Sequence, residues 1–227
     1  MAKNKHPEET IEKILVISKN LFQKKGYDKT TMHDIIRELG MSKGAIYYHF
    51  TSKEEILEAV IQRQFRASHD NLVTTINQIT AKNAKEKLTR LLEILEQRQT
   101  ENKLSATQEV MINQAKNPQF VISGMQIAVQ KEAPIFSEII KEGILDGSLK
   151  TDYPDECAEM FLLLINVWCS PFLFHDHIGN VEKRLRFLRY NLQLLGVDIV
   201  SEELITKMIS YYKEVYDETE KVEKEQE

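Results

Sequence analysis

Apolar residues recur at three- and four-residue steps along most of the chain, and this spacing limits the fold more than any other feature. Between Pro7 and Gly26, for example, they fall on one face of a helix with acids at its start and lysines at its end. No stretch shows the sustained alternation of apolar and polar residues that is typical of a strand. The chain has only eight glycines and five prolines in 227 residues, and its 42% apolar content suffices for a sizeable core. We therefore predict an all-α protein.

Capping residues divide the N-terminal quarter of the chain into short helices. Thr31 and Asp34 have the spacing of a capping box at the start of a second helix, which Gly40 is expected to end. Ser42 is the expected cap of a third helix that runs to about Phe50. Because two helices joined by a tight glycine turn form a helix-turn-helix, we predict this motif here.

Charge is distributed unevenly along the sequence. Residues 1–53 contain ten lysines or arginines and six acids, a net of +4, whereas residues 54–227 carry a net of -9. A positive module attached to an acidic body is typical of a protein that binds phosphate groups at one end only.

The stretch MSKGAIYYHF, residues 41–50, places a glycine and several polar rings in the third helix. Ile46 and Phe50 are expected to point inward, which leaves Lys43 and both tyrosines available to a partner. Gly44 costs a helix about 1 kcal/mol relative to alanine, so some gain should offset it. Its missing side chain would let the backbone approach a DNA strand, where free N–H groups favour phosphate. Half-buried packing of the rings is the alternative, but the caps, the charge and the glycine together favour a recognition helix.

The segment GYDKTTMHDIIRELGMSKGAIYYHFTSKEEIL, residues 26–57, resembles the DNA-binding segment of the TetR/AcrR family of transcriptional regulators. The shared pattern includes the glycine-aromatic pair, the threonine pair, the Gly-Met-Ser-x-Gly-x-Ile-Tyr-x-His-Phe run and the Ser-Lys pair after it. The resemblance implies a ligand-responsive regulator, a repressor by the family's default, that binds a palindromic double-stranded DNA operator as a homodimer. It places DNA contacts on Thr31, Met32, Ser42, Lys43, Gly44, Ala45, Tyr47, Tyr48, His49 and Lys53.

Two positions depart from the family pattern. Ile36 stands where alanine is common, which implies a slightly bulkier core. Ala45 offers no hydrogen bond to a base, so readout at that position would be apolar or by DNA shape. The operator sequence does not follow from these residues.

The chain is predicted to divide into a helix-turn-helix domain, residues 1–52, and a helical effector-binding and dimerisation domain, residues 53–216. An acidic tail at residues 217–227 is expected to fray. A fourth helix, with a capping box at Ser52 and Glu55, joins the two domains without a flexible linker. A shift of the body that tilts this helix would move the recognition helix, as the resemblance implies for ligand response.

Two segments of the body predict a homodimer. One is apolar nearly all round, from Cys157 to Trp168, as expected for a helix buried on both sides. The other has the 4-3-4-3 spacing of a seam that packs against a partner helix. Packing within one chain is the alternative reading of both segments. The seam consists of Val181, Leu185, Leu188, Leu192 and Leu195.

The resemblance places a small-molecule effector among the middle helices of the body. Candidate lining residues combine apolar surface with a few polar groups, although each is more often plain core. Asn166 is the sharpest candidate, because a lone amide within an apolar helix must find a partner. The candidates are Met111, Gln114, Phe120, Met125, Phe136, Asn166 and Trp168.

Other classes of protein lack support in the sequence. There is no phosphate-binding glycine loop, nucleophile elbow, zinc-type His-Glu pair or carboxylate pair, so we expect neither an enzyme nor a cofactor. The HDH run at His175 to His177 does not have the spacing of a metal site, and we expect no metal. A small-molecule carrier or adaptor that does not regulate DNA is the alternative function.

The sequence also bears on the compartment. The longest apolar run, Met160 to Cys169, is far shorter than the roughly 20 residues that a membrane span requires. The N-terminus lacks the apolar centre of a signal peptide. We therefore expect no membrane association and a cytoplasmic location, with both cysteines as buried free thiols.

Overall fold

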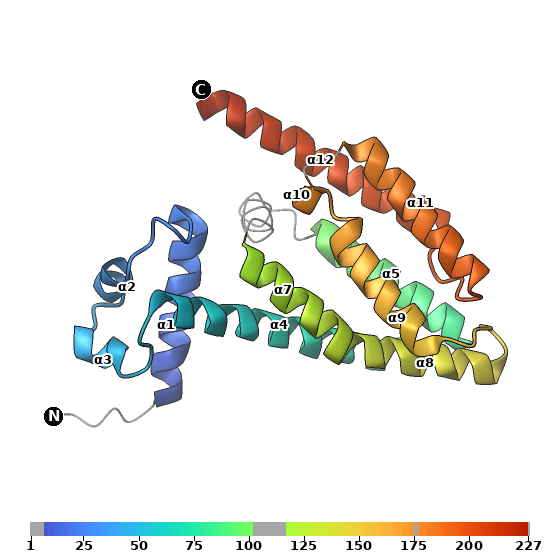
Figure 1. The fold of residues 1–227 in the computed structure, drawn as a ribbon, viewed down its shortest axis with the longest axis horizontal. Coiled ribbons are helices and arrows are strands. Elements are labelled where there is room, and N and C mark those ends of the chain that lie inside the picture. The colour runs from blue at the N-terminus through green and yellow to red at the C-terminus, as the bar shows by residue number, and fades with distance from the viewer. Residues whose placement is uncertain (1–6, 102–116, 175–176, 227) are drawn as a thin grey trace. The chain divides into compact units, whose positions relative to one another are not determined.

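A computed structural model of the 227-residue chain describes residues 7–101, 117–174 and 177–226 (Figure 1). All the regular structure in these ranges is helical, which confirms the predicted all-α class. The chain forms two compact units, residues 1–68 and 69–227, each with its own core. Each unit is therefore described by itself. The division falls inside a helix, whereas the division predicted from sequence at residues 52 and 53 marks where that helix begins.

The N-terminal unit contains three helices and the first part of a fourth. The helices are α1 (Pro7–Lys25), α2 (Met32–Leu39), α3 (Lys43–Tyr47) and α4 (Lys53–Gln78). Gly26 and Gly40 have φ angles of 79° and 62°, the left-handed conformation that glycine adopts without strain and that ends α1 and α2. These two turns set the order helix, turn, helix that the sequence predicts.

Two details of this unit differ from the sequence prediction. Helix α3 ends at Tyr47, because the backbone tightens into a turn at Tyr48 and His49 before it reaches Phe50. At the start of α4, Ser52 Oγ accepts a hydrogen bond from the Glu55 N–H, as expected of a cap. The Glu55 carboxylate, however, accepts from the N–H and the hydroxyl of Thr51 instead of from Ser52. The cap is therefore shared between two residues.

The second unit is a bundle of helices that begins with the end of α4. The elements are α5 (Ala84–Glu101), α7 (Pro118–Ile127), η1 (Ala128–Glu132), α8 (Ala133–Asp146), α9 (Pro154–Leu163), η2 (Leu164–Trp168), α10 (Pro171–Phe174), α11 (Ile178–Leu194) and α12 (Glu202–Gln226). The two η elements are single π-helical turns, a geometry that is rare and often found at functional sites. Among the described residues, no helix combines the length and the apolar composition needed to cross a membrane.

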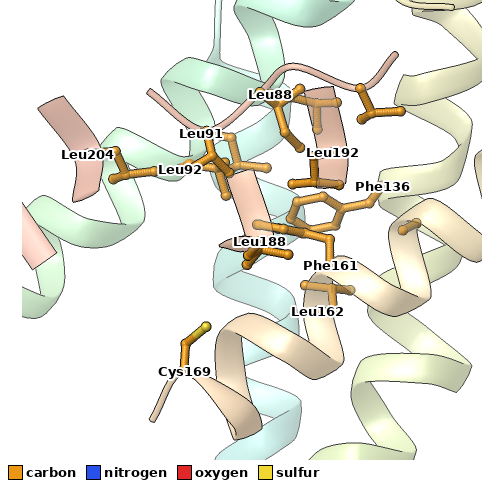
Figure 2. Close-up of a cluster of buried hydrophobic side chains, with 14 of the residues drawn as sticks. Leu88, Leu91, Leu92, Phe136, Phe161, Leu162, Cys169, Leu188, Leu192 and Leu204 are labelled. Carbon is orange, nitrogen blue, oxygen red and sulfur yellow. The ribbon is translucent and has the colours of Figure 1, made fainter. Parts of the chain in front are cut away.

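The core of the body is built where α5, α8, α9 and α11 meet. Phe136 of α8 and Phe161 of α9 face each other with ring centroids 5.8 Å apart. Figure 2 shows leucines of α5 and α11 around this aromatic pair. Cys157 and Cys169 are buried free thiols, and burial raises the pKa of Cys169 to about 12.

The predicted heptad seam belongs to this core. Val181, Leu185, Leu188 and Leu192 are fully buried within the chain's own body, and Leu195 packs against the same cluster. The seam therefore packs inside one chain, which is the alternative that its spacing left open. The opposite, exposed face of α11 carries Phe187, Tyr190 and Leu194, which are 54%, 58% and 67% exposed.

Helix α12 continues to Gln226 and so includes most of the acidic tail, residues 217–226. The tail is rich in glutamate and lysine, residues that lose little side-chain freedom in a helix. This composition favours a helix over the segment.

Candidate nucleic-acid interface

A small apolar core holds the short helices of the N-terminal unit in place. Ile35 of α2 and Ile46 of α3 are both fully buried against Ile14 of α1, and Phe50 and Ile56 close the same cluster. Because α3 has only five residues, its position depends on this packing rather than on helix propensity. Packing thus fixes which faces of α2 and α3 are left exposed.

A polar clasp joins the turn after α1 to the start of α4. Lys53 Nζ donates to the Tyr27 carbonyl oxygen at 2.9 Å and lies 4.1 Å from the centre of the Tyr27 ring. The Tyr27 hydroxyl donates to Glu54 Oε1 at 3.0 Å. Partial burial, followed by the Glu54 carboxylate, raises the pKa of Tyr27 to about 12. Lys53, predicted as a DNA contact, therefore uses one of its three N–H donors within the fold.

The predicted capping box at the start of α2 is present. The Asp34 N–H donates to Thr31 Oγ1 at 3.1 Å, and the Thr31 N–H donates to Asp34 Oδ2 at 3.1 Å. The Thr31 hydroxyl, which also donates to Asp34, lowers the pKa of this carboxyl well below its usual range, and Lys25 adds to the effect. The hydroxyl of Thr31 is thus committed to the cap, while its exposed methyl group and that of the half-buried Met32 remain at the surface end of α2.

Helix α3 presents most of the predicted contact residues. Ser42 is exposed, and its Oγ accepts from the N–H of the half-buried Ala45 at 3.3 Å. Lys43 is exposed with its Nζ 5.5 Å from the centre of the Tyr47 ring. Tyr48 is 82% exposed and meets the half-buried His49 edge to face at 5.0 Å. A cation and two tyrosine hydroxyls therefore lie on one short exposed element.

Gly44 stands between these side chains with open space around it. A Cβ placed on Gly44 would meet nothing within 4 Å. Its backbone is also not in the left-handed region, so nothing in the fold of this unit requires a glycine at the position. The space at Gly44 is therefore open to the approach of a partner's backbone.

The predicted effector residues that the structure describes lie in different environments. Phe136 is buried in the core, Phe120 and Met125 are half-buried on α7, and Asn166 is exposed to solvent rather than enclosed. Trp168 is half-buried against Phe187, with ring centroids 5.8 Å apart. Met111 and Gln114 lie outside the described residues. Exposure to water satisfies the Asn166 amide, so the argument from an enclosed amide does not hold.

A surface cavity of about 220 Å³ lies between the end of α4 and α5, away from those candidates. Arg90 Nη1 donates to the Thr80 carbonyl oxygen and Arg98 Nη1 to Thr75 Oγ1, both at 2.5 Å. The bond from Arg98 ties α5 to α4, and the bond from Arg90 ties α5 to the turn that follows α4. Its lining residues are Thr75, Gln78, Ile79, Thr80, Arg90, Ile94 and Arg98.

The HDH run has a structural role at the one residue that the structure describes. His177 Nδ1 accepts from the Gly179 N–H at 3.1 Å and caps the start of α11. His175 and Asp176 lie outside the described residues. Within the described ranges, no group of three or more histidine, cysteine or acidic side chains is placed to hold a metal ion.

Comparison with known proteins covers both units. Residues 14–60 match the model of the bacterial regulatory proteins of the tetR family, and residues 101–186 match that of the tetracyclin repressor-like C-terminal domain. The HTH-type transcriptional repressor KstR2 of Mycolicibacterium smegmatis is 27% identical over 66% of this chain and 73% of its own length. YfiR, an uncharacterised HTH-type transcriptional regulator of Bacillus subtilis, is 37% identical over 25% of this chain and 28% of its own length.

The solved structures agree on the fold. A TetR-family transcriptional regulator from Pectobacterium atrosepticum has a TM-score of 0.59 at 18% identity, with 86% of this chain and 98% of that chain covered. At this identity the likeness shows the fold alone. Several curated relatives, YfiR among them, are matched over about a third of their length or less, in segments of 57 to 77 residues.

Proposed function

This chain belongs to the TetR family of bacterial regulatory proteins, and we propose that it binds a palindromic DNA operator as a homodimer. Bound there it represses transcription, and a small-molecule effector in the body releases it. The family consists of transcriptional regulators, which are not enzymes. The curated relatives are named as HTH-type regulators and repressors, which favours this function over that of a carrier or adaptor.

The main support for the proposal is the position of Gly44. The fold does not require a glycine there, and the exposed side chains of Lys43, Tyr47 and Tyr48 lie around it. Lys43 is suited to a phosphate or a guanine edge, and the tyrosine hydroxyls to phosphates. Met32 and Ala45 would contribute apolar contacts, such as those to thymine methyl groups. Thr31, Ser42, His49 and Lys53 complete the proposed contact surface from the ends of α2, α3 and α4.

The direct test is a fluorescence-anisotropy titration of the full chain against palindromic DNA from upstream of its own gene. Binding led by phosphate contacts should weaken steeply as salt rises, by roughly 10³-fold or more between 50 and 200 mM for about six contacts. Equal affinity for scrambled DNA, or no binding at 50 mM salt, would refute operator recognition.

Two double variants distinguish a specific contribution of the α3 surface to operator binding from a general effect of lost charge. Lys43→Ala with Tyr48→Ala should lower operator affinity at least 100-fold, because it removes a phosphate contact and the most exposed ring of α3. Lys150→Ala with Tyr153→Ala makes the same change of composition at exposed positions of the body. This control should bind the operator as the unaltered chain does.

The exposed face of α11 supports the homodimer. Phe187, Tyr190 and Leu194 form an apolar surface of the kind that interfaces bury, on the side of the helix away from the buried seam. Sedimentation of Phe187→Ala with Leu194→Ala should show a weakened dimer, whereas exposed Leu145 of α8 changed to alanine should leave it intact. A dimer insensitive to the α11 variant would place the interface elsewhere.

A further inference from the structure

The surface cavity between α4 and α5 contains a guanidinium whose charge is not balanced by any carboxylate of the described residues. Arg98 Nη1 donates to Thr75 Oγ1 at 2.5 Å. Thr75 is buried, and its hydroxyl donates in turn to the Asn71 carbonyl oxygen at 2.7 Å. The partner of Arg98 is thus an uncharged group that the fold holds in place.

Arg90, the second arginine of the cavity, differs in this respect. Its Nη2 forms an ion pair with Glu86 Oε1 at 2.6 Å, so its charge is balanced within the fold. None of the seven lining residues is acidic. Among the described residues, Arg98 therefore gives the cavity an uncompensated positive charge.

The remaining N–H groups of Arg98 have the geometry that recognises a carboxylate. A guanidinium has five N–H donors, and the bond to Thr75 uses one of them. Within the described part of the chain, Nε and Nη2 make no hydrogen bond, and two such parallel donors match the two oxygens of a carboxylate. Gln78 is exposed at the end of α4 and also lines the cavity, where its amide can donate to an anion.

The rest of the cavity is suited to a compact apolar group. Ile79 and Ile94 line it, and both are half-buried. Its volume is about 220 Å³, whereas about 150 Å³ is enough to take up benzene and drug-sized ligands need about 300 Å³ or more. The space thus matches one ring or a short chain beside a carboxylate, rather than a polycyclic or long-chain ligand. Inorganic phosphate would leave both isoleucines uncovered.

We propose that this cavity is the effector site and that its ligand is a small organic carboxylate, bound by Arg98, whose ring or short chain covers Ile79 and Ile94. The inference rests on the proposed function, because it names the effector that would release the operator. The end of α4 lines the cavity, and the same helix begins at Lys53 in the N-terminal unit. A ligand bound there would thus act on a helix that both units share. Residue spacing did not indicate this site, because Thr75 and Arg98 lie on different helices.

Calorimetric titration of the full chain without DNA tests this inference. The probes are benzoate, phenylacetate and hexanoate, each compared with its uncharged amide and with acetate, which has the charge without the apolar body. We expect at least one of the three carboxylates to bind tenfold or more tightly than both its amide and acetate. If none exceeds its amide, the inference is overturned. If acetate binds as tightly as all three, the apolar part of the proposal is overturned.

A substitution at Arg98 assigns the binding to the cavity. Arg98→Gln removes the charge and keeps an N–H group that can donate to Thr75, so it should weaken the carboxylate about tenfold or more and leave the amide unchanged. Arg66→Gln, the same change at an exposed position of α4 that does not line the cavity, should have no effect. Arg98→Lys keeps the charge without the paired donors and should give an intermediate affinity. Unchanged binding by Arg98→Gln would overturn the inference.

A second pair of variants adds a charge and leaves Arg98 in place, so it does not depend on how Arg98→Gln folds. Gln78→Glu puts a carboxylate at an exposed position of the cavity and should weaken the bound carboxylate roughly fivefold or more by charge repulsion. Asn77→Asp adds the same charge at the next exposed position, which does not line the cavity, and should weaken it much less. Equal losses would show that binding responds to overall charge and would overturn the placement of the site.

The carboxylate and operator experiments fail separately. If the chain binds a carboxylate in this way but no operator, the site exists and the proposed function is refuted. If it binds the operator and no carboxylate exceeds its amide, the regulator stands and the carboxylate site does not. When both hold, adding the carboxylate should release the operator from the unaltered chain and not, at the same concentration, from Arg98→Gln. An operator that stays bound at saturating carboxylate would show that the cavity is not the effector site.

Discussion

Two glycines, one in each unit, stand at positions that differ in what demands them. Gly196 follows α11 in the left-handed conformation, with φ at 76°, and a Cβ there would lie 1.7 Å from the Lys150 carbonyl oxygen. Gly44 in α3 has ordinary backbone angles and open space where its Cβ would be. The fold of the body accounts for the first glycine, whereas nothing in the fold of the N-terminal unit requires the second. A glycine that the fold does not require is thus a candidate for a functional role.

The two units can also be compared by the hydrogen bonds that their polar groups make. In the N-terminal unit the hydroxyls and charges of Thr30, Thr31 and Lys53 are engaged in local bonds. In the body, His69 Nδ1 is shielded from solvent and has no such bond. Buried polar atoms without a hydrogen-bond partner thus occur in both units, at Ser18 Oγ in the first and at His69 Nδ1 in the second.

The largest effect is expected at Gly196. Changing it to alanine forces a Cβ into the Lys150 backbone and strains a left-handed residue, so the body should lose about 3 kcal/mol or more of unfolding free energy. Urea unfolding of the full chain measures this loss. A variant as stable as the unaltered chain would show that the loop at residues 147–153 moves easily, and would remove the contrast between the glycines.

Gly44→Ala should affect binding and leave the fold intact. Alanine favours a helix, so the unfolding free energy should stay the same or rise by up to about 1 kcal/mol. Operator affinity should fall at least about tenfold, which is 1.4 kcal/mol, because the methyl group holds the DNA backbone away. Anisotropy and urea unfolding on the same preparation separate the two effects. Unchanged affinity would mean that no partner approaches at Gly44.

Two buried hydroxyls of the N-terminal unit differ in whether they have a hydrogen-bond partner. Thr30 Oγ1 donates to the Gly26 carbonyl oxygen at 2.8 Å, whereas Ser18 Oγ is buried without a partner. Thr30→Val should therefore cost about 1 to 2 kcal/mol, and Ser18→Ala should be neutral or stabilising by up to about 1 kcal/mol. Hydrogen exchange of the α1 and α2 amides would register both changes. A destabilised Ser18→Ala would mean that Ser18 has a partner in solution.

The smallest effect concerns pH and the capping box. The hydrogen bond from Thr31, followed by that from Lys25, lowers the folded pKa of Asp34, so the charged carboxylate stabilises α2 above its ordinary pKa of 3.8. This contribution is lost as the pH falls below 3.8 toward the folded pKa. Hydrogen exchange of α2 should thus distinguish the unaltered chain from Asp34→Asn at pH 6, and the difference should shrink at pH 3. Glu38→Gln, at an exposed position on α2, serves as the control.

The parts of the fold predicted from sequence are those that depend on neighbours a few residues apart. The Thr31 and Asp34 box, the glycine turns and the Ser42 cap need only three- or four-residue spacing, and all are present. The end of α3 was less predictable because tertiary packing of Phe50, rather than local propensity, sets the turn before it.

Some features of the body could not be predicted from the spacing of residues in the sequence. Heptad spacing identified the buried face of α11 but could not say which chain covers it, because packing within a chain and between chains uses the same pattern. Asn166 was expected to need a partner because it is a lone amide in an apolar helix, yet it lies exposed in the π-helical turn η2.

The clasp of Tyr27, Lys53 and Glu54 has a consequence for the order in which the protein forms. It joins residues only 26 and 27 positions apart, and it closes a loop that holds both α2 and α3. Contacts this local favour fast folding. Ribosomes add about 5 to 20 residues per second, so synthesis of residues 69–226 takes on the order of ten seconds after the clasp has emerged. The helix-turn-helix would then be assembled on the nascent chain well before the body.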